Sequence, residues 1–70
     1  MKARTGDWIV VEPSHVGGHR RRGLVLEVRG ADGAPPYRVR WSEDGQESLV
    51  FPGEGAHVVH QGDIERYAQG

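Results

Sequence analysis

Several arginines stand together in one short stretch of this chain, and arginine is a side chain well suited to binding phosphate. Arg20, Arg21 and Arg22 follow two glycines, Gly17 and Gly18, with one histidine between them. A guanidinium group pairs with two phosphate oxygens at once, and glycine lets backbone N–H groups approach the same oxygens. The segment 15–22 is therefore a candidate site for nucleic acid or another polyanion, although such a run on a loop is more often simply solvated.

The net charge of the whole chain does not favour long-range attraction of a polyanion to this candidate site. Nine basic residues, all arginine except Lys2, stand against ten acidic ones and leave a formal net charge of -1. No net positive field attracts nucleic acid from a distance. Arg38 and Arg40 nevertheless alternate with apolar residues and could extend the patch on the outer face of a strand. Glu27 and Glu47 are candidate partners that would neutralise it.

The histidines offer a second candidate chemistry. They stand at positions 15, 19, 57 and 60, spacings that suit two metal ligands on a helix. Neither pair is expected on a helix, and on a strand positions 57 and 60 face opposite ways. A zinc site would also need a third ligand, such as Glu54 or Asp63. We therefore predict no metal and no cofactor, and expect solvated histidines.

The aromatic residues suggest a third possibility, a groove for a proline-rich or methylated peptide. The candidates are Trp8, Tyr37, Trp41 and Phe51. Most of them are needed for the core, and Tyr37 is expected at the edge of the groove because it follows Pro36. Catalysis has no comparable support, since the carboxylates stand beside turns and no Ser-His-Asp arrangement stands out. The protein is predicted not to be an enzyme.

The elements that must position these side chains are clearest in the middle of the chain. Runs 37–41 and 47–51 alternate apolar with polar residues and are joined by a polar connection that contains Asp44-Gly45. This pattern predicts an antiparallel hairpin. In the first strand Tyr37, Val39 and Trp41 point one way, and in the second we assign Leu49 and Phe51 to the same face, with Val50 opposite.

Three further strands are predicted at 7–12, 23–29 and 56–60. The strand at 7–12 is apolar on both faces, so it is buried on both sides or bent. In the strand at 23–29, Leu24, Leu26 and Val28 are expected to point inward, unless a bulge places Val25 there. Segment 14–22 is expected to be a mobile loop, and Asp63 to cap a helical turn that reaches Tyr67.

Five short strands separated by glycine-rich turns predict an all-β fold, a small five-stranded antiparallel barrel or strongly bent sheet. The chain is predicted to be one domain over 1–70, with a core at about 4–60 and a tail at 61–70. The predicted core consists of Trp8, Leu24, Leu26, Val39, Trp41, Leu49, Phe51 and Val58. The absence of cysteine and of a long apolar run predicts a cytoplasmic protein without a membrane segment.

Four motifs in order carry a resemblance to a known family. They are Gly6-Asp7-Trp8-Ile9-Val10-Val11, Arg22-Gly23-x-x-Leu26-Glu27-Val28, Asp32-Gly33-x-Pro35-Pro36-Tyr37-x-Val39-Arg40-Trp41 and Asp44-Gly45-x-Glu47-x-Leu49-Val50-Phe51-Pro52-Gly53. Over residues 1–60 the chain resembles very small, mostly actinobacterial proteins classified only as a domain of unknown function. The resemblance implies an SH3-like barrel of five strands and brings no activity, cofactor or catalytic residue.

Two functional hypotheses follow from the sequence, both for a binding module without catalysis. In the first, the module contacts nucleic acid or another polyanion through the loop at 15–22 and the outer-face residues Arg38 and Arg40. In the second, it is a protein-interaction module or a homodimer that uses an exposed strand edge or the aromatic groove. The sequence itself names no partner.

Overall fold

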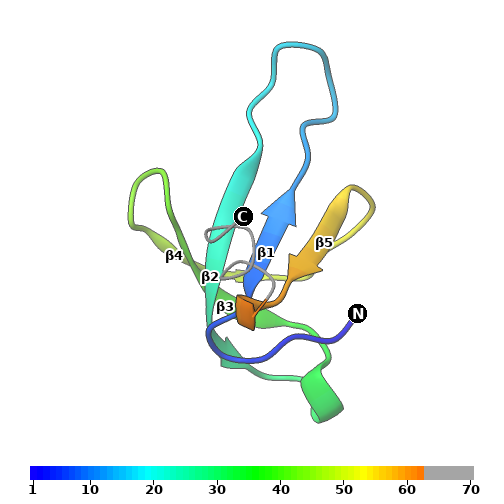
Figure 1. Cartoon of the computed structure of the whole chain (residues 1–70), viewed down its shortest axis with the longest axis vertical. Coiled ribbons are helices and arrows are strands. Elements are labelled where there is room, and N and C mark those ends of the chain that lie inside the picture. Colours follow the sequence, from blue (N-terminus) through cyan, green and yellow to red (C-terminus); the bar gives the residue numbers. More distant parts are fainter. Residues whose placement is uncertain (63–70) are drawn as a thin grey trace.

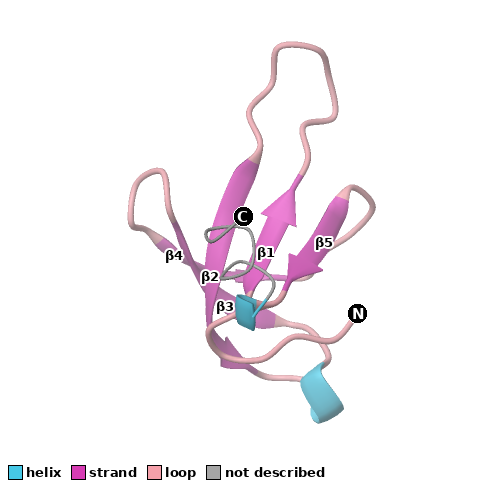
Figure 2. Ribbon diagram, in the orientation of Figure 1, coloured by secondary structure: helices cyan, strands magenta, loops and turns pink. Residues whose placement is uncertain are grey.

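A computed structural model describes residues 1–62 of the chain as five strands and one short 3-10 turn (Figures 1 and 2). The elements are β1 (Trp8–Val11), β2 (Arg21–Val28), η1 (Ala31–Gly33), β3 (Tyr37–Trp41), β4 (Glu47–Val50) and β5 (Ala56–Val59). The predicted all-β class is confirmed. The helical turn predicted between Asp63 and Tyr67 lies outside the described residues.

All five strands belong to one antiparallel sheet, in the order β4-β3-β2-β1-β5. Strands β4 and β5 form its two edges, and within residues 1–62 no ladder joins them, so the sheet is not closed. The segment 51–55 carries the chain from one edge to the other, and the segment 12–20 between β1 and β2 extends away from the sheet as a long arm (Figure 1).

The hairpin predicted at the middle of the chain is confirmed. Strands β3 and β4 pair with Arg40 opposite Glu47, and the Trp41 N–H donates to the Gln46 carbonyl at 2.8 Å. Gly45 has a φ of 74°, a left-handed conformation that glycine adopts without steric cost. The Asp-Gly sequence therefore forms the turn that the pattern predicted.

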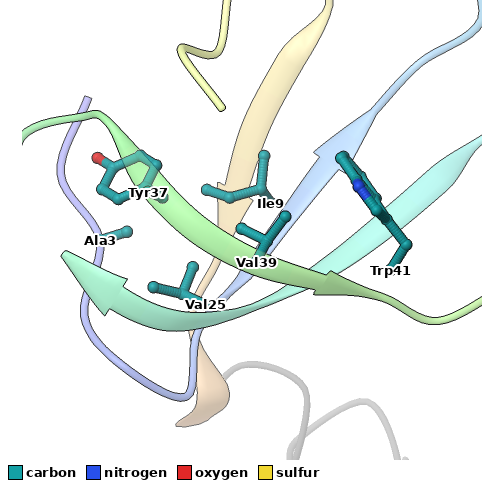
Figure 3. Close-up of a cluster of buried hydrophobic side chains, with 6 residues drawn as sticks. All are labelled: Ala3, Ile9, Val25, Tyr37, Val39 and Trp41. Carbon is teal, nitrogen blue, oxygen red and sulfur yellow. The ribbon is translucent and has the colours of Figure 1, made fainter. Parts of the chain in front are cut away.

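The core lies on the face of the sheet that carries the alternate residues of β3 (Figure 3). Its buried members are Ala3, Ile9, Val25, Tyr37, Val39 and Trp41. The predicted core positions Val39 and Trp41 are confirmed, and Val58 packs against this cluster as a half-buried residue. The predicted burial of both faces of β1 is also confirmed, since Ile9 and Val10 are both buried.

For β2 the prediction that Leu24 and Leu26 point inward was wrong, and the alternative, a bulge that places Val25 inward, is confirmed. Val25 pairs with Val39 across the β2–β3 ladder, so the two side chains point to the same side of the sheet, and Val25 is fully buried. Leu24 and Leu26 are only half-buried. The register shifts between Val25 and Glu27, which is the bulge that the sequence left open as an alternative.

The prediction also assigned the wrong residues of β4 to the core. Leu49 is 47% exposed and Phe51 is 73% exposed, whereas Val50 packs against the core cluster. The cause is the register of the hairpin, which places Val50 directly opposite the buried Tyr37. Residues opposite each other share a face of the sheet, so Leu49 must point to the other side.

Candidate binding surfaces

The arginine triplet does not form one patch, because β2 begins at Arg21 and not at Gly23 as predicted. Val11 pairs with Arg21 and Val10 with Arg22, so the β1–β2 ladder extends into the predicted loop. Successive residues of a strand point to opposite faces. Arg20 therefore stays in the arm, while Arg21 and Arg22 lie on different faces of the sheet.

Two members of the triplet have acidic partners. The Nε atom of Arg20 lies 3.0 Å from a carboxylate oxygen of Glu12, and Arg21 pairs with Glu43. The guanidinium carbon of Arg21 also lies 4.1 Å from the centre of the Trp41 ring, a cation–π contact. Arg21 thus covers the indole at one end of the core, which is a structural role.

The arginines of the outer face share their acids. Glu47 accepts from Arg38 at 3.1 Å and lies 3.5 Å from Arg40, and Glu27 pairs with Arg29 at 2.9 Å. The neutralising role expected of Glu47 across the strands is confirmed, whereas Glu27 neutralises Arg29, which lies two residues further along the chain. Exposed pairs of this kind contribute about 0–1 kcal/mol each, so another ligand can displace them.

Arg22, Arg38 and Arg40 share the outer face, since Val10 lies opposite Arg22 and Leu24 opposite Arg40. In the described part of the chain, Arg22 has no acidic partner. The outer face therefore carries more guanidinium groups than carboxylates.

The four histidines are all exposed. Over residues 1–62, no three groups of the His, Cys, Asp and Glu types are placed to hold a metal ion together. His15 and His19 lie in the arm, while His57 lies on β5 and His60 just after it.

The assignment of Tyr37 to the edge of an aromatic groove was wrong. Tyr37 is fully buried, and its hydroxyl donates to the Gly33 carbonyl at 2.7 Å. Burial raises the pKa of this phenol. The N-terminal segment covers the ring, because the Ala3 N–H bonds to Gly33 and Ala3 itself belongs to the core. No local sequence pattern indicates that cover.

An apolar groove lies instead where the chain leaves β4 and approaches β5. Its volume is about 200 Å³. The lining residues are Ile9, Val11, Trp41, Val50, Phe51, Pro52, Gly53, Glu54 and Ala56. Two of the aromatic residues proposed for a groove, Trp41 and Phe51, are therefore brought together, and Phe51 is the one that solvent reaches.

A buried carboxylate, which the sequence did not single out, links the start of β1 to the residues that follow β5. Asp7 is 5% exposed and accepts from the backbone N–H groups of Arg4 at 2.9 Å and Gln61 at 3.1 Å. The Nδ1 atom of His60 lies 3.0 Å from the same carboxylate. Burial alone would raise the pKa of Asp7, but these hydrogen bonds together lower it. The carboxylate is therefore ionised at neutral pH and holds residue 60 against the start of β1.

These features define a small all-β domain with an open antiparallel sheet, an apolar groove at the open side and exposed apolar side chains on one edge. The chain belongs to the family described as Domain of unknown function (DUF1918), whose profile matches residues 1–58. The predicted resemblance is confirmed.

Mycobacterial relatives extend over most of the chain. The uncharacterized protein Rv0569 of Mycobacterium tuberculosis (strain ATCC 25618 / H37Rv) is 48% identical over 59 residues, which cover 84% of this chain and 67% of that protein. The uncharacterized protein Mb2324 of Mycobacterium bovis is 46% identical over 59 residues, or 84% of this chain and 74% of that protein. No solved structure matches the chain significantly. Among residues 1–62, no helix is long and apolar enough to span a bilayer.

Proposed function

We propose that this protein is a non-catalytic protein-interaction domain that binds an apolar segment of another protein in the groove beside Phe51. The observation that carries the proposal is the 73% exposure of the Phe51 side chain at the rim of an apolar hollow of about 200 Å³. A phenyl ring gains about 1.5–3 kcal/mol from full burial, so a partner that covers it is stabilised by that contact.

The position of the groove supports this proposal. The groove lies on the core side of the sheet, where Trp41 and Val11 are among its lining residues. Rigid strands position these residues, and aromatic side chains are enriched among the residues that dominate binding energy at interfaces. Val50, which packs against the core cluster, lines the groove next to Phe51 and continues its apolar surface.

The proposed fold family fits this role. We propose that the open sheet is an SH3-like barrel, supported by a meander of four strands whose fifth strand returns to pair with the first. That order brings the two edges of the sheet around one core, as a small partly open barrel requires. The cysteine-free composition supports a cytoplasmic location, where thiols stay reduced.

The test begins with selection of peptides from a random library displayed on phage, with the purified protein as bait. A selected peptide is expected to change the fluorescence of Trp41 and to lose at least about 10-fold in affinity with Phe51→Ala, from the burial energy of the ring. Val16→Ala is the matched control, because Val16 is exposed in the arm, away from the groove. Failure to enrich any peptide, or equal affinities for both variants, refutes the proposal.

A second candidate, binding of nucleic acid or another polyanion, is supported by the outer face of the sheet. There Arg22, Arg38 and Arg40 outnumber the carboxylate of Glu47, which two of them share. A phosphate backbone can take over such an exposed pair, and binding of this kind weakens steeply as salt rises.

Fluorescence anisotropy with labelled single-stranded and double-stranded oligonucleotides at low salt tests the second candidate. Binding is expected to weaken in the double variant Arg38→Ala with Arg40→Ala, and to weaken further when Arg22→Ala is added. No change in anisotropy up to high micromolar protein excludes it. Salt separates the two candidates, because burial of Phe51 depends on it only weakly.

A further inference from the structure

The two edges of the open sheet differ in the backbone groups that they leave free. In an antiparallel ladder, alternate residues direct both N–H and C=O toward one neighbour. Because the Trp41 N–H donates to Gln46, positions 46, 48 and 50 bond toward β3. Glu47 and Leu49 therefore direct their N–H and C=O groups away from the sheet, along the free edge of β4.

The edge formed by β5 has fewer free backbone groups and fewer exposed apolar side chains than the edge formed by β4. The Glu12 N–H donates to Gly55, so by the same alternation Ala56 and Val58 direct their backbone groups outward. The outward N–H of Ala56 is already bonded to the Gly53 carbonyl at 3.2 Å. Val58 is also half-buried, so this edge presents no large exposed apolar side chain.

The free backbone groups of β4 are accompanied by exposed apolar side chains. Leu49 stands on the strand itself and is 47% exposed, and Phe51 follows two residues later at 73%. A free strand edge with exposed apolar side chains readily accepts another strand. The only prolines near it, at position 52 and in the turn before β3, lie outside β4, so β4 keeps all of its N–H donors.

Acidic residues flank β4 in the sequence. Asp44 precedes β4 in the hairpin turn and Glu54 follows it in the segment that leads to β5. Among the ion pairs of residues 1–62, neither has a basic partner. A second copy of β4 would bring its own acids to this edge, whereas a segment with basic ends would neutralise them.

We propose that the free edge of β4 takes up an extended segment of a partner protein as a sixth strand. That segment carries apolar residues at alternate positions, which cover Leu49 on the outer face, and basic residues at both ends, which complement the charges of Asp44 and Glu54. Main-chain hydrogen bonds to Glu47 and Leu49 supply affinity, and the side chains supply selectivity. This inference rests on the proposed protein-interaction function and specifies its partner.

The experiment uses the full chain and a labelled nonapeptide, Lys-Val-Thr-Val-Thr-Val-Thr-Val-Lys. Two control peptides have glutamate at both ends or proline at the central position. Expected results are binding of the first peptide with weaker binding of both controls, and exchange of the Leu49 amide hydrogen at least about 10-fold slower in the complex, because a new hydrogen bond protects it.

Variants of the protein separate backbone from side-chain effects. Leu49→Pro removes an outward N–H that β3 does not use, and Leu49→Lys keeps the backbone but adds a charge that repels the basic ends. Both are expected to weaken binding at least about 10-fold by loss of these contacts, and Leu49→Lys serves if the proline variant fails to fold. Val16→Lys is the matched control and is expected to bind as the original chain does.

Each other outcome overturns the inference in a distinguishable way. One outcome is binding that changes the fluorescence of Trp41 and is weakened by Phe51→Ala, while the Leu49 amide hydrogen exchanges at an unchanged rate. That outcome supports the groove and refutes strand addition. If the nonapeptide does not bind, strand addition is refuted. The groove is tested independently by the peptide library selection. A dimer that forms without peptide and is abolished by Leu49→Lys places a second copy on the edge and also refutes the proposed partner.

Discussion

Replacement of Asp7 tests whether one buried carboxylate stabilises the fold by linking the start of β1 to the residues that follow β5. Its two oxygens accept from the N–H groups of Arg4 and Gln61 and contact His60. Asparagine keeps the size of the side chain but replaces one oxygen with an NH₂ group, which then faces a donor. Alanine removes both acceptors. The two variants should therefore destabilise the fold to different degrees.

The expected magnitudes follow from the hydrogen bonds. A hydrogen bond to a charged group contributes about 1.5–3 kcal/mol, and a buried donor left without a partner costs about 1–3 kcal/mol. Asp7 is nearly buried, whereas His60 beside it is exposed, so water partly replaces the lost acceptor. We expect a loss of about 1–2 kcal/mol for Asp7→Asn and about 2–3 kcal/mol for Asp7→Ala. A chain of 70 residues has a total stability of about 3.5–10 kcal/mol, so both losses are measurable.

Urea unfolding followed by tryptophan fluorescence measures these losses at pH 7. With a slope of about 1 kcal/mol per molar urea, the midpoint for Asp7→Asn falls by about 1–2 M. Asp32→Asn is the matched control, because Asp32 is exposed and its φ of 56° suits asparagine equally well. It should change stability by less than about 0.5 kcal/mol. Equal stabilities of the Asp7→Asn and Asp32→Asn variants refute the structural role of the carboxylate.

A second check is the pH dependence of the difference in unfolding free energy between the original chain and Asp7→Asn. The folded state lowers the pKa of Asp7, so the stabilisation is present above the unfolded pKa of about 3.9 and is lost as pH falls through the lower folded value. The stability gap between the original chain and Asp7→Asn should therefore be constant at neutral pH and narrow below about pH 4. A gap that widens in acid contradicts the lowered pKa.

Two further substitutions test the core. Tyr37→Phe should cost about 1 kcal/mol in urea unfolding, because the hydrogen bond from the hydroxyl to the Gly33 carbonyl is lost while the one from Ala3 remains. Since burial raises the pKa of Tyr37, the phenol contributes stability below about pH 10 that is lost as pH rises further, and the phenylalanine variant should lack that loss. Gly23→Ala should cost about 1–3 kcal/mol by overpacking, because its Cβ would lie 2.9 Å from Val39. Gly53→Ala, with no heavy atom within 4 Å of its Cβ, is the control, and an equal effect of the two contradicts the predicted close packing.

The central hairpin was predictable because every signal in that stretch agrees. Tyr37, Val39 and Trp41 alternate with arginines, and Asp44-Gly45 stands between the two runs. A period of two over five residues leaves one choice of face for each side chain, and a turn with glycine at positive φ closes the connection. Local chemistry therefore sufficed for the strand, the turn and the burial of its apolar side.

The second strand of that hairpin shows where local information ends. Leu49, Val50 and Phe51 are all apolar, so alternation alone allows either face to be buried. The choice depends on which residue pairs with Tyr37, and that depends on the length of the connection. For the same reason the sequence did not foresee that Phe51 would remain exposed beside a groove.

Prediction of the candidate binding residues from the sequence was limited in the same way. The composition of 15–22 correctly indicated exposed arginines, but the extra length of β2 decided that Arg21 covers Trp41 while Arg22 faces the other side. The contact between Asp7 and His60 spans 53 positions in the chain, beyond the reach of any local pattern.

The sequence by itself determined the strand-forming segments, the all-β class, the family and the absence of disulfide bonds. The tertiary structure decided which apolar side became the core, which acids neutralised which arginines and which strand edge stayed free. The physical reason is that alternation assigns side chains to the two faces of a single strand. Only the pairing of strands and the covering segments around them determine which of those faces solvent can reach.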